Sequence, residues 1–460
     1  MKKTQPVKKN DDITLTIDAY TSEGAGIGRI DGFAVFVPGA LIGETVDAHI
    51  IKVTSSYAVG KLISIFNINK KIRATPVCSV CDKCGGCDLQ HMTYAAQLSF
   101  KRDRVQNALT RIGGADIEVP SVLPSKNEIR YRNKASFPFA EIDGKVKLGF
   151  YAHRSHRLIP TDDCAVQKDE TVAVLRLTEK WANAHKISAY DEEKGDGILR
   201  HLVVRATHEG VLVCIVTSGN TLPYADQLAE MLSEGLHEAN SNLVGLIHNI
   251  NPKATNVILG TKYKLVCGRD SIDEEICGMK FRVRTPSFLQ VNHEQTEKLY
   301  NTALDFLNAQ KHESVFDIYC GIGTITLMAA KSAGHVTGIE YVQESVDDAK
   351  ENAQRNGIEN ASFFAGAAER ILPELVEKGQ KADAVILDPP RAGCDADVLH
   401  AIAKSGAVRV VYVSCNPETL ARDIKILASH GYTCTKVQPV DMFPQTGHVE
   451  TVVLMSRDVK

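Results

Sequence analysis

The C-terminal half of the chain alternates between short apolar runs and helical stretches. From about residue 314 the runs are rich in Val, Ile and Phe, and each is followed by a stretch with helical character. This alternation predicts a doubly wound parallel sheet with helices on both faces. The strands are expected at 315–320, 335–340, 362–365, 384–388 and 409–415. Ligands of such sheets bind beyond the carboxyl ends of the strands, so the residues there are the first candidates for a functional site.

The last of these strands ends in a cysteine. Cys415 follows the apolar run, Asn416 is a favourable helix N-cap, and Pro417 is typical of the first position of a helix, which is expected to reach about His430. A thiol there lies near unpaired N–H groups and the positive end of the helix dipole, which favours its thiolate. The position therefore predicts a nucleophile, and a small buried core cysteine is the alternative.

Three other strand ends carry groups suited to an adenosine-containing cofactor. Gly321 and Gly323 follow the first strand and allow a ligand to approach the backbone. Glu340 ends the second strand, where a carboxylate can bind both ribose hydroxyls. The pattern does not separate NAD from S-adenosylmethionine, but the missing third glycine favours the methyl donor. Asp388, which two prolines follow, is a rigid acceptor for a base edge or for the cofactor.

The N-terminal residues predict a basic arm and a small barrel. Residues 1–10 contain four lysines and are expected to be disordered. From 11 to 66, short alternating segments separated by glycine and proline turns predict a β-barrel. The glycine-rich segment 24–32 has no helix after it, so it is not a dinucleotide-binding loop, and it resembles the TRAM domain, an OB-like RNA-binding barrel. Arg29, Phe33 and Phe36 are its candidate nucleic-acid contacts.

A cysteine cluster and a mixed α/β region follow in residues 67–282. Cys78, Cys81, Cys84 and Cys87 lie at intervals of three. In a chain without a secretion signal they indicate zinc or an iron–sulfur cluster rather than disulfides, and the spacing leaves both open. Beyond them the sequence predicts a helix at 94–111, strands at 199–206, 211–217 and 243–250, and a helix near 224–236. Part of this region, 93–125, is expected to pack on the C-terminal domain, which spans 283–460.

Composition limits the cellular location and the partners. The chain is 44% apolar and 24% charged, with a net charge of −3, as in an ordinary soluble protein. No apolar run is long enough to cross a membrane and no signal region follows the first lysines, so we expect a cytoplasmic protein. Residues 101–157 carry 12 Lys or Arg against 6 Asp or Glu, which favours phosphate contact. The basic and aromatic segment 130–134 suits the same contact, with an exposed edge strand as the alternative.

Five segments in order resemble the signatures of the RNA uracil-5-methyltransferases, and the likeness runs nearly from end to end. They are Phe-Leu-Gln-Val-Asn at 288–292, Asp-Ile-Tyr-Cys-Gly-Ile-Gly-Thr at 317–324, Asp-Pro-Pro-Arg at 388–391, Ser-Cys-Asn-Pro-Glu-Thr-Leu-Ala-Arg-Asp at 414–423 and Gly-His-Val-Glu-Thr at 447–451. The resemblance implies that S-adenosylmethionine contacts four side chains, namely Gln290, Tyr319, Glu340 and Asp388. It also implies that Cys415 is the nucleophile and Glu450 the base.

The chemistry of this family explains why it needs a cysteine and a carboxylate. Carbon 5 of uracil becomes reactive towards a methyl group when a thiolate adds to carbon 6, and a base then removes the carbon 5 proton. Fixed donors stabilise the enolate oxygen, and the target base must leave its stack. His448, close to Glu450, either belongs to this site or is a structural hydrogen-bonding residue.

The resemblance also selects a metal group and a substrate. The ribosomal-RNA branch carries Cys-x5-Cys-x2-Cys and a distant cysteine, which implies a [4Fe-4S] cluster on Cys78, Cys84, Cys87 and Cys164, with Cys81 nearby or replacing a ligand. The implied substrate is uridine in 23S ribosomal RNA, for a monomer without a membrane or an obligate protein partner. Transfer RNA methylation and a non-catalytic iron–sulfur RNA-binding module are the alternatives. Cytosine methylation needs a second cysteine, for which Cys394 is an imperfect candidate, and radical chemistry needs a Cys-x3-Cys-x2-Cys spacing that is absent.

Overall fold

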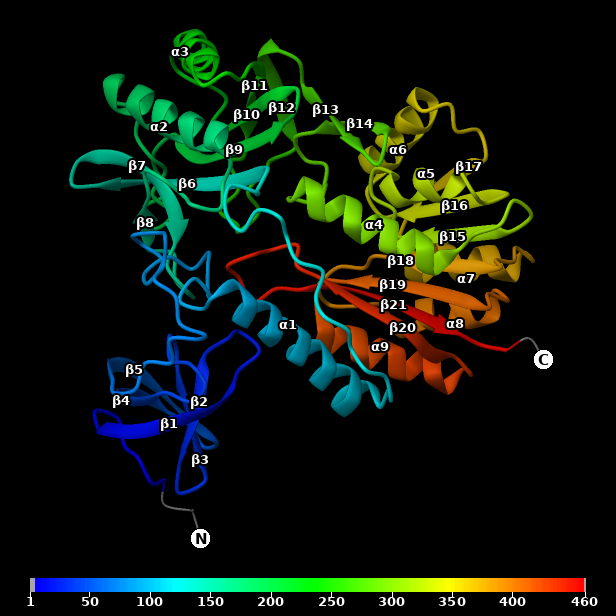
Figure 1. Ribbon diagram of the computed structural model, residues 1–460. Helices are drawn as coiled ribbons and strands as arrows, with labels where there is room; N and C mark the ends of the chain where they lie inside the picture. Colours follow the sequence, from blue (N-terminus) through cyan, green and yellow to red (C-terminus); the bar gives the residue numbers. More distant parts are fainter. Residues whose placement is uncertain (1–4, 459–460) are drawn as a thin grey trace.

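The computed structural model describes residues 5–458. Figure 1 shows a small N-terminal barrel, a central α/β region and a C-terminal α/β region, with the helix α1 (Tyr94–Ala108) lying between the barrel and the C-terminal sheet. No helix in the described part of the chain is long and apolar enough to cross a membrane.

The N-terminal barrel is closed and follows the predicted strands. Its order is β1-β2-β3-β5-β4, and alternate apolar side chains fill its interior. The strands are β1 (Asp12–Tyr20), β2 (Gly26–Ile30), β3 (Phe33–Val37), β4 (Thr45–Val53) and β5 (Tyr57–Ile65). Gly26 and Gly28 lie on β2 at close approaches, because a Cβ there would stand 2.7 Å from the carbonyl oxygens of Ala40 and Thr16 respectively. The glycines of this segment therefore allow close packing within the barrel, which agrees with the prediction that the segment is not a dinucleotide-binding loop.

The prediction of a disordered basic arm is wrong for residues 5–10. Val7 is only 2% exposed and belongs to the barrel core, and Gln5 donates a hydrogen bond to the carbonyl of Thr54. Val7, the apolar side chain between the two pairs of lysines, packs into the barrel interior. A count of charges over the segment does not indicate this contact. Residues 1–4 of the predicted arm lie outside the described residues.

The central region is built on a seven-stranded sheet with the order β12-β11-β10-β9-β6-β7-β8. Helices α2 and α3 cover one face of this sheet with a common apolar core (Figure 1). The predicted strands β9, β10 and β11 and helix α3 are confirmed. The elements are β6 (Lys134–Ile142), β7 (Lys145–Tyr151), β8 (Leu158–Pro160), α2 (Asp169–Ala184), β9 (Leu199–Thr207), β10 (Gly210–Thr217), α3 (Ala225–Glu238), β11 (Leu243–Ile250) and β12 (Lys262–Gly268). The hairpin β13 (Ser271–Ile276) and β14 (Met279–Arg284) packs between this sheet and the C-terminal region.

The C-terminal region is the predicted doubly wound sheet, with one addition. Five parallel strands run in the order β17-β16-β15-β18-β19, and β21 then joins β19 antiparallel, followed by β20. The elements are α4 (His293–Leu307), β15 (Ser314–Ile318), α5 (Thr324–Ala330), β16 (His335–Glu340), α6 (Gln343–Arg355), β17 (Ala361–Ala365), α7 (Ala368–Glu377), β18 (Ala384–Leu387), α8 (Ala396–Lys404), β19 (Arg409–Ser414), α9 (Pro417–Ser429), β20 (Thr433–Val440) and β21 (Glu450–Ser456).

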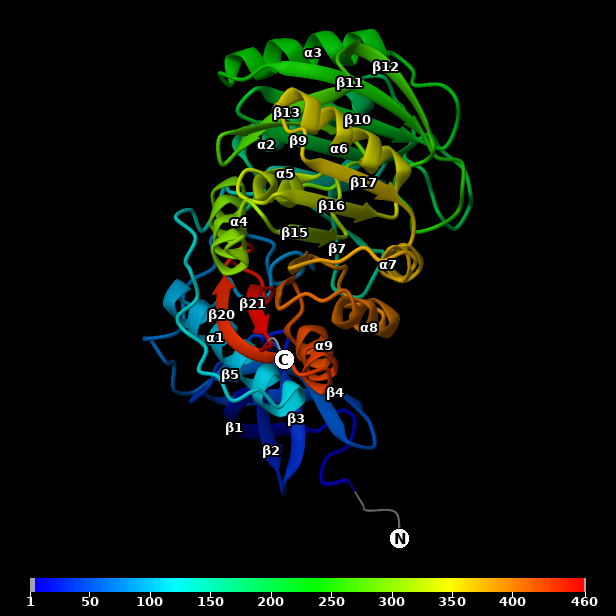
Figure 2. The same ribbon diagram turned by 90° about the vertical axis from the view of Figure 1, so that its right-hand side faces the viewer.

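Two apolar cores cover the two faces of this sheet. Helices α4 and α5 pack on one face and α7, α8 and α9 on the other (Figure 2). Val105, Ala108 and Leu109, from α1 and the short π-helical turn that follows it (Leu109–Gly113), belong to the second core. The segment next to the barrel is therefore built into the C-terminal region, and this fixes the barrel near the carboxyl ends of the strands.

Candidate active site

Cys415 and Glu450 meet at the end of the antiparallel pair β19–β21. Ser414 pairs with Thr451 in this ladder, so the next position along places Cys415 opposite Glu450. Asn416 caps α9, since its side chain accepts a hydrogen bond of 3.1 Å from the Glu418 N–H. The predicted strand, N-cap and Pro417 start of the helix are thus confirmed, and α9 ends one residue before His430. The two residues are neighbours only because β21 inserts beside β19.

The electrostatic surroundings of Cys415 differ from the prediction. Burial raises the pKa of the Cys415 thiol to about 11, and the charges of Glu450 and Asp388 add to this effect. Arg391 acts in the opposite direction. The thiol pKa therefore lies above its ordinary value in the free protein, where burial and two nearby carboxylates raise it, and the predicted lowering is not found.

Glu450 has a buried carboxyl group with one oxygen unpaired within the described part of the chain. It is 2% exposed, and its Oε2 has no hydrogen-bond partner among the described residues. Burial raises the pKa of Glu450 well above its ordinary value, and the charge of Asp388 raises it further. Burial also raises the pKa of Asp388 to about 7. A buried carboxylate oxygen without a partner costs free energy in the free protein, and such a group is typical of a functional site.

Arg391 is a site residue that the sequence reasoning did not single out. Its positive charge lowers the pKa of both Cys415 and Glu450. Its backbone carbonyl accepts hydrogen bonds of 3.2 Å from the Asn416 amide and the Thr419 hydroxyl, which tie the loop to the start of α9. Arg391 is the last residue of the Asp-Pro-Pro-Arg motif. A cation three residues after the carboxylate at the end of a strand is the sequence signal that could have identified it.

His448 lies beside Arg391, with 3.4 Å between the imidazole Nε2 and a guanidinium nitrogen. Burial lowers the pKa of His448 to about 4, and Arg391 and Arg104 lower it further. The imidazole is therefore neutral at pH 7. A neutral histidine next to arginine fits the structural alternative, in which His448 accepts a hydrogen bond and orients Arg391.

The glycines and the acid of the predicted cofactor site have separate tasks. The carboxylate of Glu340 accepts hydrogen bonds from the Gly321 N–H at 3.0 Å and the Val342 N–H at 2.9 Å. Gly321 has a φ of 56°, and a Cβ there would meet no protein atom within 4 Å, so its backbone faces open space. A Cβ on Gly323, by contrast, would press on Ala349 at 3.1 Å. The first glycine leaves room for a ligand, and the second allows close packing.

Tyr319 and Gln290 are the other two residues of the predicted cofactor site. Gln290 is buried in the segment before α4. Tyr319 has a φ of 69°, and its phenol lies near Cys394, which together with burial raises the pKa of the phenol. Cys394 is buried, and its N–H donates to Asp423 at 2.8 Å. It is not among the charges that act on Cys415, so the structure places it in the packing beneath the site.

Five cysteines line a single cavity of about 270 Å³. Cys78, Cys81, Cys84 and Cys87 reach it from one segment and Cys164 from the loop after β8, and the same cavity is lined by Arg391 and His448. Burial raises the pKa of Cys87 to about 12 and that of Cys164 to about 11. The charges of Cys78 and Cys84 act on Cys87 and Cys164, and they act on Cys81 as well. The structure thus brings Cys164 to the four cysteines of the other segment, and all five thiols share the cavity.

The donor chemistry of this cavity fits a sulfur-ligated metal group. Ionised thiols this close repel one another, and a cationic metal centre would remove that repulsion. Within residues 5–458, however, no three Cys, His, Asp or Glu side chains stand close enough together to form a ready-made metal site. The cavity is tied to the loop before Glu450, because Leu89 N donates to Gln445 O at 3.0 Å and the Tyr131 hydroxyl to Pro444 O at 2.9 Å.

The basic segment 130–134 leads into the central sheet. Only Lys134 of this segment lies in a strand, β6, and Tyr131 and Asn133 are buried, so the alternative of an exposed edge strand is wrong for residues 130–133. Burial lowers the pKa of Lys134 to about 7, and Arg205 and Arg132 lower it further. Arg132 also lines the cysteine cavity. The segment therefore brings positive charge close to the cavity shared with Arg391.

The sheet order and the site at its strand ends define a methyltransferase of the Rossmann-like, S-adenosylmethionine-dependent class. Residues 221–458 match the model of the tRNA (uracil-5-)-methyltransferase family, and residues 6–63 match the TRAM domain. The chain belongs to the RNA uracil-5-methyltransferase family, and it is an RNA methyltransferase. The resemblance found in the sequence is thereby confirmed, as is the TRAM barrel.

Curated relatives and a solved structure agree with this assignment. An uncharacterized RNA methyltransferase of Clostridium tetani is 45% identical, over 99% of this chain and 98% of the relative. A second, from Halalkalibacterium halodurans, is 43% identical over 99% of both chains. The crystal structure of Pyrococcus abyssi tRNA (uracil-54, C5)-methyltransferase in complex with S-adenosyl-L-homocysteine has a TM-score of 0.76 and 25% identity, and covers 96% of this chain and 99% of that one.

Proposed function

We propose that this protein methylates carbon 5 of uridine in 23S ribosomal RNA, with Cys415 as nucleophile and Glu450 as base. The observation that carries the proposal is the position of Cys415 opposite Glu450, whose buried Oε2 lacks a partner among the described residues. A thiol and a free carboxylate oxygen at the end of one strand pair are the two groups that this reaction requires.

The proposed reaction uses these groups in order. Cys415 transfers its proton to solvent water, and its Sγ forms a bond to carbon 6, which moves an electron pair through the ring to the carbonyl oxygen as an enolate. S-adenosylmethionine, when bound, supplies the electrophilic methyl group that carbon 5 takes up. Glu450 Oε2 then accepts the carbon 5 proton, the ring regains its double bond, and the bond between Sγ and carbon 6 breaks. Arg391 is the candidate that stabilises the enolate, since it is the cation that acts on both residues.

The proposed methyl-donor site lies at the neighbouring strand ends. Glu340 retains acceptor capacity for the ribose beyond its two backbone hydrogen bonds, and the open space at Gly321 allows close approach. The full proposed set is Gln290, Tyr319, Gly321, Gly323, Glu340 and Asp388. For Tyr319 the contact is made by the ring face, because its hydroxyl is directed to Cys394.

We further propose that Cys78, Cys84, Cys87 and Cys164 ligate a [4Fe-4S] cluster, with Cys81 outside the ligand set. The shared cavity and the mutual interaction of these thiols support this assignment. Such a cluster would join the segment after the barrel, which contains Leu89, to the loop between β8 and α2. It would thereby also fix the wall of the cavity to which Arg132 belongs. Methylation by this route needs no electron, so the proposed role is structural.

The substrate has one alternative that a particular observation favours. The solved structure that covers 96% of this chain is a transfer RNA methyltransferase, and the matching family model carries a transfer RNA name. Against this stand the TRAM barrel and the cysteine pattern that resembles the ribosomal-RNA branch. The proposed division into an RNA-binding barrel at 11–66, which residues 5–10 extend, a cluster domain at 67–282 and a methyltransferase domain at 283–460 applies to either substrate.

Mass mapping of methyl groups distinguishes the two substrates. The purified protein is incubated with S-adenosylmethionine and with unmodified 23S ribosomal RNA and transfer RNA in parallel. The proposal predicts methyl groups at carbon 5 of one or two ribosomal uridines, and none in transfer RNA. Methylation confined to transfer RNA would keep the reaction and overturn the substrate, whereas no transfer to either RNA would overturn both.

A further inference from the structure

One face of helix α1 holds the loop that precedes Glu450. Tyr94, Gln97, Lys101 and Arg104 are spaced by three, four and three residues, which places them on one side of a helix. Each side chain contacts a residue of the loop 441–447: the Tyr94 hydroxyl and the Lys101 ammonium donate to the Asp441 carboxylate, the Gln97 amide donates to Gln445, and the Arg104 guanidinium donates to Gly447 O. A helix from the region next to the barrel therefore determines the path of the catalytic-domain loop.

Arg104 makes contacts on both sides of the proposed active site. Its Nε and one terminal nitrogen donate to the two carboxylate oxygens of Glu418, at 3.0 and 2.7 Å. Its other terminal nitrogen donates to the Gly447 carbonyl at 2.8 Å. Glu418 lies in the first turn of α9, three residues after Cys415, and Gly447 lies three residues before Glu450. One planar guanidinium thus bridges the segment of the nucleophile and the segment of the base.

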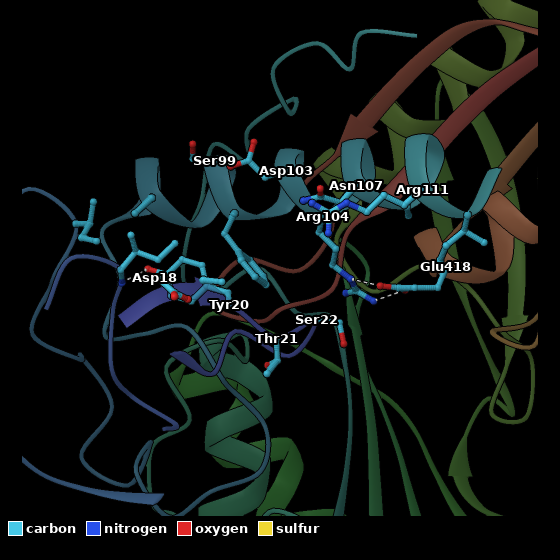
Figure 3. A pocket seen from close by; sticks show the side chains of 17 residues that line it. Asp18, Tyr20, Thr21, Ser22, Ser99, Asp103, Arg104, Asn107, Arg111 and Glu418 are labelled. Atoms are coloured by element: carbon cyan, nitrogen blue, oxygen red, sulfur yellow. Dashed lines mark hydrogen bonds and ion pairs between the residues drawn. The ribbon is translucent and has the colours of Figure 1, made fainter. Parts of the chain in front are cut away.

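A groove of about 650 Å³ runs along the other side of this bridge. It lies between the barrel, which contributes Asp18 and Tyr20, and α1, and the Arg104–Glu418 pair forms part of its wall (Figure 3). Its charged side chains are three acids and two arginines, which does not favour an RNA phosphate. The Arg104 side chain is only 15% exposed, and all three of its guanidinium nitrogens are engaged inside the protein. Its contacts point towards the active site rather than to a ligand in the groove.

We infer that Arg104 is a positioning residue, which sets the separation between the Cys415 thiol and the Glu450 carboxylate by tying α9 to the loop at Gly447. The inference rests on the proposed function, because it assigns Arg104 to the two residues proposed to act on uracil. A bidentate carboxylate contact combined with a carbonyl contact needs the fork of arginine, and lysine cannot make all three hydrogen bonds. A displacement of about 1 Å in such a site can reduce a rate by about a hundredfold.

The test compares Arg104→Gln and Arg104→Lys with the native protein on unmodified RNA. We expect turnover to fall by about ten- to a hundredfold in Arg104→Gln and less in Arg104→Lys, with the KM for S-adenosylmethionine unchanged. Displacement of the loop affects proton removal more than thiol addition, so a covalent methylated protein–RNA complex should accumulate, detectable as a slowly migrating band. Glu418→Gln should give a smaller loss, because it leaves the Gly447 contact in place.

Arg111→Ala is the matched control. Arg111 lines the same groove about two helical turns further on, and it makes no ion pair within residues 5–458. This variant should keep native turnover. Folding is checked by the circular dichroism spectrum and the Tm, and Arg104→Lys takes the place of Arg104→Gln if the latter does not fold.

Two results would overturn the inference. The first is native turnover in a folded Arg104→Gln protein. The second is a turnover that falls only in proportion to the fraction of folded protein, with no accumulation of the covalent complex. The native protein provides the separate check on the proposed function, through its covalent adduct with RNA that contains 5-fluorouridine. No adduct with the native protein contradicts the proposed function, whereas a native adduct with an unaffected Arg104→Gln variant contradicts only the role of Arg104.

Discussion

Cys415 and Glu450 face each other one position beyond the Ser414–Thr451 pair, where β21 runs antiparallel to β19. The side-chain period of a strand is two, so a shift of this register by one residue would turn Glu450 to the opposite face of the sheet. The antiparallel insertion of β21 therefore brings the Glu450 carboxyl group to the strand end that the Cys415 thiol occupies. Three predictions concern this pair, one concerns the cysteine cavity and one concerns the helix α1.

Cys415→Ala should abolish the covalent adduct with RNA that contains 5-fluorouridine. The fluorine at carbon 5 cannot leave as a cation, so the native protein should remain attached through the Cys415 sulfur after methylation. The adduct is measured by denaturing gel and peptide mass analysis. Cys394→Ala serves as the control, since Cys394 is buried beneath the site, and an adduct that survives in Cys415→Ala would remove Cys415 from the nucleophile role.

Glu450→Gln should trap the methylated intermediate on ordinary RNA. The amide keeps the size of the side chain but cannot accept the carbon 5 proton, so turnover should fall by about 10²- to 10⁴-fold. The methyl group should still be transferred, and a covalent complex that contains labelled methyl should accumulate. Rapid turnover by this variant would exclude Glu450 as the base.

The reactivity of Cys415 towards iodoacetamide should rise only in alkaline solution. Burial and the charges of Glu450 and Asp388 raise the thiol pKa to about 11. The thiol therefore keeps its proton at pH 7 and loses it only as the pH rises through its pKa. Removal of a like charge in Asp388→Asn should shift the profile to lower pH. The measurement is the alkylation rate of the Cys415 peptide against pH, and a midpoint near or below 8 in the native protein would contradict the electrostatic account.

Iron and acid-labile sulfide should depend on four of the five cysteines in the cavity. Cys87→Ser and Cys164→Ser should each lose the cluster, whereas Cys81→Ser should retain it, because Cys81 lies outside the Cys-x5-Cys-x2-Cys pattern. The protein is purified without oxygen and its iron, sulfide and zinc contents are determined. Stoichiometric zinc without sulfide would favour the tetrahedral zinc site instead.

Lys101→Met should destabilise the protein by about 3–5 kcal/mol, because it leaves the buried Asp441 carboxylate without its ammonium partner. The two side chains are both fully buried and joined by a hydrogen bond. The double variant Lys101→Met with Asp441→Leu should recover part of the loss, since it removes both charges. Urea unfolding measures the difference, and equal stability of Lys101→Met and native protein would show that the pair does not hold α1 to the loop.

Much of the architecture follows from local patterns. The alternation of apolar runs and helices placed all five parallel strands within one or two residues, and Asn416 and Pro417 marked the start of α9. These features depend on neighbours a few residues apart, which the chain itself specifies. The same holds for the turn at Gly321 and Gly323, where the backbone conformation is a local property.

Other features depend on residues that meet only in the folded protein. The sequence by itself determined the sheet, the barrel and the candidate residues, and it placed a cysteine where a helix dipole favours a thiolate. The tertiary structure decided the outcome there, because burial and the carboxylates of Glu450 and Asp388 raise the pKa of Cys415 instead. It also decided that Val7 enters the barrel and that Arg104 bridges Glu418 and Gly447. Desolvation and charge interactions act through space. The sequence shows which ionisable residues are present, but their burial and mutual distances, which set the pKa, exist only in the folded protein.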